Sequence, residues 1–303
     1  MDIVRFKGGL GNQMFDYALY WALKQRGRDV RIDLSFFDQN PDFPNPYKLT
    51  DYFHNIQFQP LEDDVFWQIR QRWEEVKKHP EEKEYYDTHL SERWFWAEES
   101  IETGCYREEV FETKSCTFVG WWQTEKYFRE YRQDLLREFE FQKGEKKLQE
   151  IGAKLEKSNN TVIVHIRLDN SYYEAITVQG FHRANIIQEK YYERALEKVR
   201  ELLGKDVQYV IFSDMVEQAK KVLPIENAVY IECGDFENYE DWYDMYLMGK
   251  CRCNIIANSS FSWWAAWLNQ RDDQIVIAPQ HWENRYDELL KTTDIWAEGW
   301  IKL

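Results

Sequence analysis

The sequence predicts an α/β fold built on parallel sheets, and three observations support this prediction. Short apolar runs of strand length alternate with helical segments between Thr161 and Ala278. Small polar residues follow several of these runs, where a strand would give way to a helix. The chain also opens with a strand, a glycine-rich turn and a helix, in the order of a βαβ unit.

The first half of the chain is expected to hold that βαβ unit and a less regular region. The unit comprises a strand over 3–6, a helix over 14–23 that stops at Gly27, and a strand over 30–32. Residues 38–60 are loop-like, with little periodicity and with Pro41, Pro44 and Pro46 close together. Residues 61–115 mix charged and aromatic residues and suggest helices with one aromatic face. A strand over 117–121 and an amphipathic helix over 125–139 complete this half.

The polar segment 144–160, rich in Lys and Glu, is the expected junction between two domains, 1–150 and 151–303. Beyond it the alternation predicts a doubly wound parallel sheet, in which ligands bind at the carboxyl ends of the strands. The expected strands are 161–166, 207–212, 229–231, 255–257 and 274–278. The expected helices are 188–203, 216–222, 239–248 and an aromatic segment that follows Ser260.

Composition excludes several classes of partner. The formal charge is −15, from 39 Lys and Arg against 54 Asp and Glu. The sequence has no basic stripe, so the negative field of the protein is expected to repel nucleic acid. Five Cys without a Cys-x-x-Cys pair indicate a reducing compartment and no zinc site. No apolar run resembles a signal peptide or approaches the length of a membrane span, so we expect a cytoplasmic protein that is not inserted in a membrane.

The segment from Asn254 to Leu268 is the most informative stretch of the chain. Its apolar run ends in Asn258, Ser259 and Ser260, which are helix-capping residues, and an aromatic, alanine-rich segment follows. The beginning of such a helix offers backbone N–H groups and a positive dipole end to a phosphate. The alternative is an ordinary strand–turn–helix whose Ser residues are only caps and whose Trp residues are only core.

The glycine turn from Gly8 to Gln13 belongs to neither of the two common phosphate-binding motifs. It lacks the Gly-Lys-Ser/Thr of a P-loop, and Met14 stands where the dinucleotide fingerprint needs a third Gly. Alone it indicates either close approach of the backbone to a ligand or simply a tight strand–helix turn.

Polar residues at other expected strand ends also suit an anionic nucleotide. Arg167 offers a planar fork of donors to a phosphate, and His165 precedes it on the same strand face. Asp214 and Asp244 could accept hydrogen bonds from a guanine edge. Each has a purely structural alternative: a surface ion pair, a core histidine, a turn residue or a solvated carboxylate. The chain contains no Asp-x-Asp and no cluster with metal-ligand spacing, so a bound diphosphate would depend on Arg and N–H groups in place of Mg²⁺.

Several segments together resemble the bacterial α-1,2-fucosyltransferases, and the similarity runs nearly end to end. The segments are Gly8 to Phe15, Trp122 to Phe128, Phe212 to Asp214, Tyr243 to Met248 and Ile256 to Trp264. Residues 61–115 match this family least. The late Ala-Asn-Ser-Ser-Phe-Ser-Trp-Trp run is long enough to be specific.

This resemblance implies a GT-B-like fold, in which two Rossmann-like domains face each other across a cleft. It implies a metal-independent, inverting galactoside α-1,2-fucosyltransferase that takes L-fucose from GDP-fucose, with the acceptor on the N-terminal domain and the donor on the C-terminal domain. Arg167 would stabilise the leaving diphosphate, and His165 and Asp244 would meet the guanine. The remaining donor contacts implied by the matching motifs are Gly9, Gly11, Asn12, Gln13, Asp214, Asn258, Ser259, Ser260 and Phe261.

The chain departs from the family pattern after the first strand of its second half. The family has His-x-Arg-Arg-Gly-Asp-Tyr, whereas this chain has Leu168 for the second Arg and Asn170 at the Asp position. Met215 replaces the second Asp of Ser-Asp-Asp. Asp169 is the candidate substitute for the lost carboxylate and, with Asp16, a candidate base for the acceptor hydroxyl. These departures leave two alternatives, a catalytically weak GDP-sugar-binding protein and a related transferase with a different donor sugar.

Overall fold

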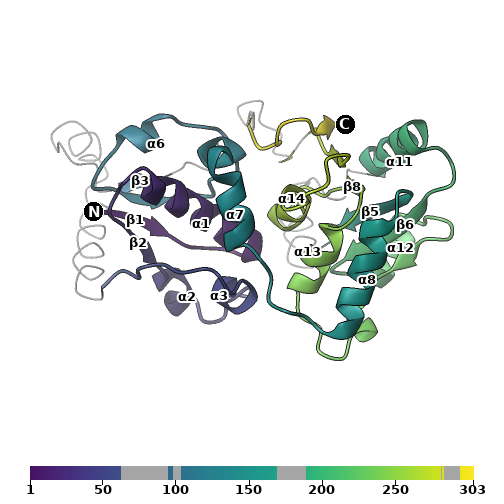
Figure 1. Cartoon of the computed structure of the whole chain (residues 1–303), viewed down its shortest axis with the longest axis horizontal. Helices are drawn as coiled ribbons and strands as arrows, with labels where there is room; N and C mark the ends of the chain where they lie inside the picture. The colour runs from purple at the N-terminus through teal and green to yellow at the C-terminus, as the bar shows by residue number, and fades with distance from the viewer. Residues whose placement is uncertain (63–94, 98–103, 169–188, 281, 283–293) are drawn as a thin grey trace, which may run out of the picture. The chain divides into compact units, whose positions relative to one another are not determined.

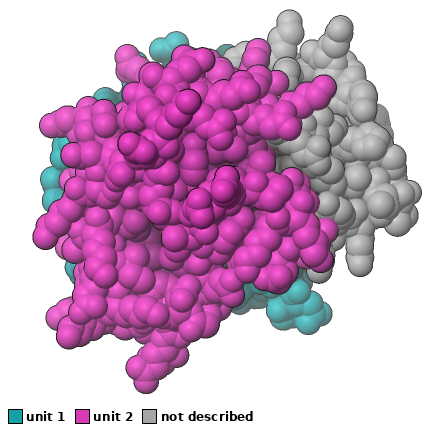
Figure 2. Space-filling model, turned by 90° about the vertical axis from the view of Figure 1, so that its right-hand side faces the viewer, with its two compact units in different colours: residues 1–138 teal, residues 139–303 magenta. Residues whose placement is uncertain are grey.

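The computed structural model describes residues 1–62, 95–97, 104–168, 189–280, 282 and 294–303. The chain divides into two compact units, Met1–Glu138 (unit 1) and Phe139–Leu303 (unit 2), which Figure 2 shows in different colours. The boundary expected after residue 150 therefore falls inside a helix of unit 2, α8 (Lys146–Lys157). The polar sequence of α8 belongs to its exposed face, because Leu148, Gly152 and Leu155 are buried and the helix packs against α13 (Trp242–Met248).

Unit 1 is built on a parallel sheet with the strand order β2–β1–β4–β3 (Figure 1). Its strands are β1 (Asp2–Arg5), β2 (Val30–Asp33), β3 (Phe95–Ala97) and β4 (Thr117–Val119). The expected βαβ unit is confirmed, since β1 and β2 pair in parallel and α1 (Leu10–Gln25) joins them. α1 begins at Leu10, four residues before the expected start at 14, because Gly9 has an extended backbone and serves as the N-cap. Gly11, Asn12 and Gln13 thus lie in the first helical turn.

Apart from the sheet and α1, the described part of unit 1 contains short helices joined by turns and loops. They are α2 (Ser35–Gln39), α3 (Leu49–Tyr52), α6 (Glu109–Glu112), η2 (Glu125–Tyr127), η3 (Arg129–Tyr131) and α7 (Arg132–Glu138). The single helix expected over 125–139 is divided, because Phe128 leaves helical geometry at φ −142° and the turns on either side of it, η2 and η3, are 3₁₀. Most of the segment expected to form aromatic-faced helices lies outside the described residues, and β3 is a strand within it that the sequence did not predict.

Unit 2 is built on a parallel sheet with the order β10–β9–β8–β5–β6–β7, which is the strand order of a Rossmann fold (Figure 1). The strands are β5 (Thr161–Ile166), β6 (Gln208–Ser213), β7 (Val229–Tyr230), β8 (Cys253–Ile255), β9 (Ile275–Ala278) and β10 (Ile301–Lys302). β8 lies two residues before the expected 255–257, and the two-residue β10 was not predicted. The order reverses between β5 and β8, so the ligand-binding crevice is expected beyond their carboxyl ends.

The helices of unit 2 follow the expected alternation. They are α8, α11 (Glu189–Leu203), α12 (Val216–Val222), η4 (Cys233–Asp235), α13 and α14 (Ser260–Trp267). Every residue of β5 is buried, and so are the indoles of Trp263 and Trp264 on α14. Cys251 and Cys253 are buried free thiols, as expected of small core residues. The α/β prediction with two parallel, Rossmann-like sheets is confirmed. Within the described residues, no helix has both the length and the apolar character needed to cross a bilayer.

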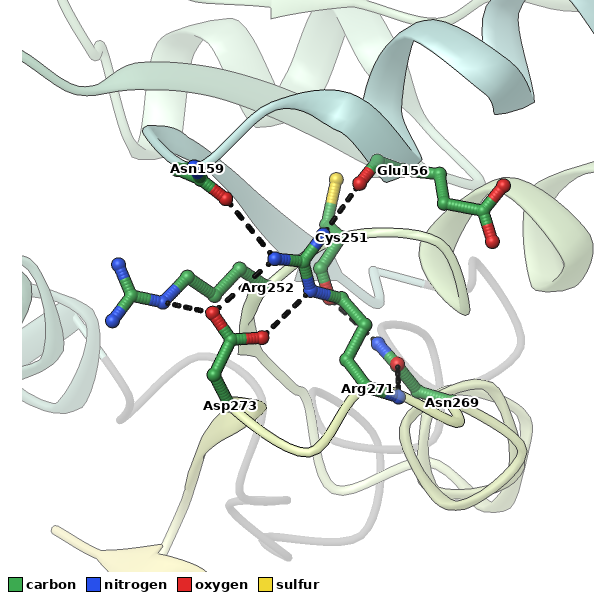
Figure 3. Close-up of polar contacts among 7 residues, drawn as sticks. All are labelled: Glu156, Asn159, Cys251, Arg252, Asn269, Arg271 and Asp273. Atoms are coloured by element: carbon green, nitrogen blue, oxygen red, sulfur yellow. Dashed lines mark hydrogen bonds and ion pairs between the residues drawn. The ribbon is translucent and has the colours of Figure 1, made fainter.

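A polar network at the amino edge of this sheet joins three loops of unit 2 (Figure 3). Arg271 donates to both carboxylate oxygens of Asp273, at 2.9 and 3.2 Å, and to Asn159 Oδ1 at 3.1 Å. It also donates to the backbone oxygen of Glu156, in the last turn of α8. The Arg252 Nε lies 3.0 Å from the same Asp273. Arg271 thereby links the end of α8 to the loops that lead into β8 and β9.

We expect Arg271→Met to lower the free energy of unfolding by about 1–3 kcal/mol, because the variant keeps the aliphatic stem but loses charge-assisted hydrogen bonds. Urea unfolding followed by circular dichroism measures this change. Arg137→Met is the matched control, because Arg137 pairs with Asp134 at an exposed site and should change stability by under about 0.5 kcal/mol. Equal effects of the two substitutions would show that the network does not stabilise unit 2.

Candidate functional site

The carboxyl edge of the unit 2 sheet brings together most of the site residues expected from the sequence. β5 pairs in register with β6 and β8, with Ile166 opposite Ser213 and Val164 opposite Ile255. Arg167 and Asp214 each follow directly on these ends. Asn258 to Phe261 form the connection from β8 into α14. The predicted anion-binding residues therefore lie at the reversal of strand order, where a Rossmann fold binds its ligand.

Arg167 is held by Asp214 from the neighbouring strand. Its Nε lies 3.3 Å from Asp214 Oδ2, and both side chains are partly exposed. The other carboxylate oxygen, Oδ1, accepts from the backbone N–H of Leu168 at 2.8 Å. Asp214 was expected to contact guanine, but the structure engages both of its oxygens with the segment that carries Arg167. A planar guanidinium held through Nε keeps the orientation of its fork, so Asp214 acts as a positioning residue.

Leu168 shows how unit 2 accommodates the loss of the family's second Arg. Its side chain is only 2% exposed and packs in the core with Val164, Ile166 and Tyr192. An Arg side chain that pointed into the core as Leu168 does would bury its charge, and burying an unpaired charge is costly. The backbone of Leu168 still serves the site through its bond to Asp214.

His165 is a buried, neutral imidazole at neutral pH. Burial, together with the nearby positive charge of Arg167, lowers the pKa of its side chain to about 3. Its ring centroid lies 6.2 Å from that of Phe261, in the first turn of α14. Nδ1 is buried and has no hydrogen-bond partner among the described residues. A buried N–H without an acceptor is costly, so the ring favours the tautomer with hydrogen on Nε2, which leaves Nε2 as a donor.

The connection from β8 to α14 combines structural and potential ligand-binding roles. Ser259 is the N-cap of α14, and its hydroxyl accepts from the Phe261 N–H at 3.3 Å, which is the structural role left open by the sequence. That hydroxyl can still donate a hydrogen bond of its own. Asn258 donates to the backbone oxygen of Trp282 at 3.0 Å, while its Oδ1 is buried without a partner among the described residues. Ser260 and Phe261 are partly exposed in the first turn, where the helix dipole favours an anion.

Asp244 lies in the first turn of α13 and has an unusual environment. Burial raises the pKa of its carboxyl to about 7, an effect that outweighs the hydrogen bond from Tyr239 that lowers it. Oδ1 is buried and lacks a hydrogen-bond partner in the described part of the chain. Tyr239 was not predicted as a site residue, because its place as the first residue of the expected helix 239–248 gave no signal of this contact. A half-protonated carboxyl with an unused oxygen is suited to a ligand that supplies N–H donors.

The glycine turn of unit 1 lies at the carboxyl ends of β1, β2 and β4. Gly8 has φ +77°, and a Cβ there would approach Asn12 Nδ2 to 2.7 Å, so the turn requires glycine. Gly9 is partly exposed, whereas Gly11 is buried inside α1. Asn12 Oδ1 accepts from Gln123 at 2.8 Å. Gln123 lies in a segment that the sequence marked only as family-like, without a role.

Gln13 and Asp16 are fully buried, in contrast to the ligand contacts expected of them. The Gln13 amide donates to the backbone oxygens of Gly8 and Pro46, each at 3.0 Å, and accepts from the Lys48 N–H at 3.0 Å. Asp16 accepts from the Lys7 N–H at 3.0 Å. Both side chains therefore position the turn from within the protein. Asp169, the expected catalytic carboxylate, lies outside the described residues, as does Asn170.

Comparison with known proteins gives the family of this chain and two curated relatives. The sequence profile of Glycosyl transferase family 11 matches residues 1–303. An alpha-1,2-colitosyltransferase of Escherichia coli is 29% identical over 99% of this chain and 98% of its own length. The O-antigen biosynthesis glycosyltransferase WbnK of Escherichia coli is 36% identical, over 45% of this chain and 44% of its own.

Solved structures of glycosyltransferases are distantly similar. The NodZ alpha-1,6-fucosyltransferase soaked with GDP-fucose aligns over 88% of this chain and 91% of its own, with 14% identity and a TM-score of 0.43. The ADP-heptose lps heptosyltransferase II of E. coli aligns over 100% and 89%, with 11% identity and a TM-score of 0.40. The family match extends over the full sequence, including both parallel sheets and the strand-end residues described above. The chain belongs to glycosyl transferase family 11.

Proposed function

We propose that this glycosyltransferase transfers L-fucose from GDP-fucose to the 2-hydroxyl of a terminal galactoside, with inversion at the transferred carbon. The observation that carries the proposal is the contact between His165 and Phe261, whose ring centroids lie 6.2 Å apart. This contact sets the end of β5 against the first turn of α14. A fixed cation and a helix N-terminus thus lie on one edge of the sheet, which suits a nucleoside diphosphate.

In this proposal each residue has a distinct role toward the donor. Arg167 stabilises the negative charge that develops on the diphosphate as the bond to the sugar breaks, and Asp214 orients it. Ser259, Ser260 and Phe261 bind phosphate oxygens at the start of α14. His165 and Asp244 contact the guanine, and Gly9 and Asn12 of the glycine turn add contacts to the donor. The absence of Asp-x-Asp from the sequence supports a reaction without a metal ion.

The acceptor hydroxyl must lose its proton during the transfer. Either a base accepts this proton, or the proton leaves late, after the bond to the donor sugar has largely broken. Asp169 remains our proposed base, on its sequence position alone. Asp16 is withdrawn from this role because it is fully buried and accepts from the backbone of Lys7.

A second candidate is the same transfer with a different donor sugar. The end-to-end similarity to an alpha-1,2-colitosyltransferase supports it. Colitose differs from L-fucose by lacking the 3-hydroxyl, so the two donors would share the nucleotide contacts and differ only at the sugar. A site that hydrogen-bonds this hydroxyl discriminates strongly against a sugar that lacks it. A catalytically weak GDP-sugar binder is the third candidate, motivated by the loss of the second Arg at Leu168.

The full chain, incubated with lactose and GDP-fucose, should release GDP and form a fucosylated product, with EDTA making no difference. Parallel incubation with GDP-colitose identifies the preferred donor through the ratio of kcat/KM values, which measures discrimination in the transition state. Turnover of GDP-colitose alone would replace the fucose assignment by the second candidate. GDP binding without turnover of either donor would favour the weak binder. Strict dependence on Mg²⁺ would contradict the metal-independent mechanism.

Arg167→Ala should lower kcat by about 10²- to 10³-fold, as the loss of one positioned donor to a developing charge does.

Both Arg167→Ala and Asp214→Asn should weaken GDP binding. Asp214→Asn keeps an oxygen that can accept from the Leu168 N–H. If Asp214 acts through Arg167, the Asp214→Asn change will have no further effect in an Arg167→Ala background. Titration calorimetry with GDP on all four proteins measures this coupling. Additive effects on GDP affinity, together with weaker binding of guanosine in Asp214→Asn, would return Asp214 to a guanine-contacting role.

GDP affinity should rise between pH 6 and pH 8 as Asp244 ionises, because its pKa lies at about 7 and only the carboxylate accepts two hydrogen bonds from guanine. In Asp244→Asn, GDP should bind more weakly, and the remaining pH dependence should be that of the nucleotide phosphate itself. The difference between the two titration profiles isolates the carboxyl group. Parallel profiles in the wild type and the variant would contradict a contact between Asp244 and guanine.

A further inference from the structure

A group of half-buried aromatic rings follows β2 in unit 1. Phe36, Phe37, Phe43, Tyr47 and Phe58 form this group, which we name the aromatic patch. Phe36 contacts Phe37 and Phe43 edge to face, with centroids 5.3 and 5.2 Å apart. Tyr47 continues the chain of rings, at 5.8 Å from Phe37 and 6.4 Å from Phe58.

The aromatic patch contacts the core of unit 1 through Phe6. Phe6, which follows β1 and is fully buried, lies 6.5 Å from Tyr47 and 6.2 Å from Phe58. The helix that carries Phe36 and Phe37, α2, has no buried residue. Packing alone would favour covering these rings, because exposed apolar surface lowers stability. Their shared partial exposure leaves aromatic surface that a ligand can contact.

The loop of the aromatic patch is fixed beside the glycine turn. The fully buried Gln13 donates to the Pro46 oxygen and accepts from the Lys48 N–H, each at 3.0 Å. The ideal Cβ position of Gly9 lies 3.5 Å from the side chain of Asn45. The loop that carries Tyr47 of the aromatic patch is thus anchored at the turn that the proposed function assigns to the donor, and Phe37 connects Tyr47 to Phe36 and, through it, to Phe43.

The chemistry of the loop selects a neutral, hydroxyl-rich ligand. Residues 34–47 carry two carboxylates, Asp38 and Asp42, and no Lys or Arg. Asp38, Asn40, Asp42 and Asn45 are all exposed. This charge repels nucleic acid and anionic lipid, while carboxylate and amide groups bond readily to hydroxyls. Aromatic faces beside such groups suit a sugar ring, which presents C–H groups on its face and hydroxyls at its edge.

We infer that the aromatic patch is a subsite for the acceptor glycan, in which Phe36 or Phe43 stacks on a sugar ring. This inference rests on the proposed function for the position of the donor. It assigns acceptor recognition to the loop after β2 and not to the segment 61–115 alone.

Phe36→Leu and Phe43→Leu test the inference, because leucine keeps apolar bulk but removes the flat aromatic face. Each variant of the full chain should bind lactose about three- to tenfold more weakly, the range expected from the loss of one aromatic contact. Saturation-transfer NMR with lactose and methyl β-galactoside measures this binding in the presence of GDP. GDP affinity from calorimetry should stay unchanged in these variants. Phe43→Tyr keeps a flat aromatic ring and should therefore retain lactose binding.

Phe111→Leu is the matched control, because Phe111 is a half-buried aromatic residue of the same unit on α6, which leads into the opposite end of β4. It should leave lactose binding unchanged. Lactose affinity equal to the wild type in both patch variants would overturn the subsite, as would the absence of saturation transfer from the wild type to either galactoside. Patch-dependent lactose binding without consumption of GDP-fucose would instead refute the donor assignment and leave the subsite standing.

Discussion

The parallel pairing of β5 with both β6 and β8 is the constraint on which the proposed donor site depends. Every residue of β5 is buried, so its register cannot shift without exposing the core. This fixed register sets His165 and Arg167 beside the end of β6 and the start of α14. Asp214 then joins two strand ends through one carboxylate, which accepts from the backbone N–H of Leu168 and pairs with the guanidinium of Arg167. Site geometry follows here from backbone pairing, and side chains refine it.

The proposed donor site would bind an anion within a strongly acidic protein. The formal charge of −15 opposes a nucleoside diphosphate at long range, although salt screens that field beyond about 10 Å. Short-range groups must therefore supply the attraction. At this edge of the unit 2 sheet, those groups are the guanidinium of Arg167, the N-terminus of α14 and His165, which burial keeps neutral. A neutral imidazole avoids placing a second positive charge beside Arg167, and it still provides a hydrogen-bond donor.

Much of this arrangement could be predicted from the sequence, because period, strand length and capping residues are local signals. β5 and α12 have the predicted bounds, and Ser259 caps α14 at the predicted place. Predictions were less accurate where a distant partner decides the structure. The polar sequence of α8 suggested a linker, but packing against α13 makes it part of unit 2. Gln13 and Asp214 are polar residues at the expected edge, yet their bonds to Pro46 and Leu168 join segments 33 and 46 residues away. No local pattern encodes such contacts.

The way in which Gln13 holds the loop after β2 has a consequence for how acceptor choice can evolve. Its two hydrogen bonds to that loop are with main-chain atoms, the oxygen of Pro46 and the nitrogen of Lys48. An anchor of this kind does not depend on which side chains the loop carries. Mutation can exchange the exposed residues between 36 and 45 while the glycine turn keeps its conformation. Selection can thus alter which glycan is recognised without disturbing the machinery that handles the nucleotide, so the two traits are free to diversify at different rates.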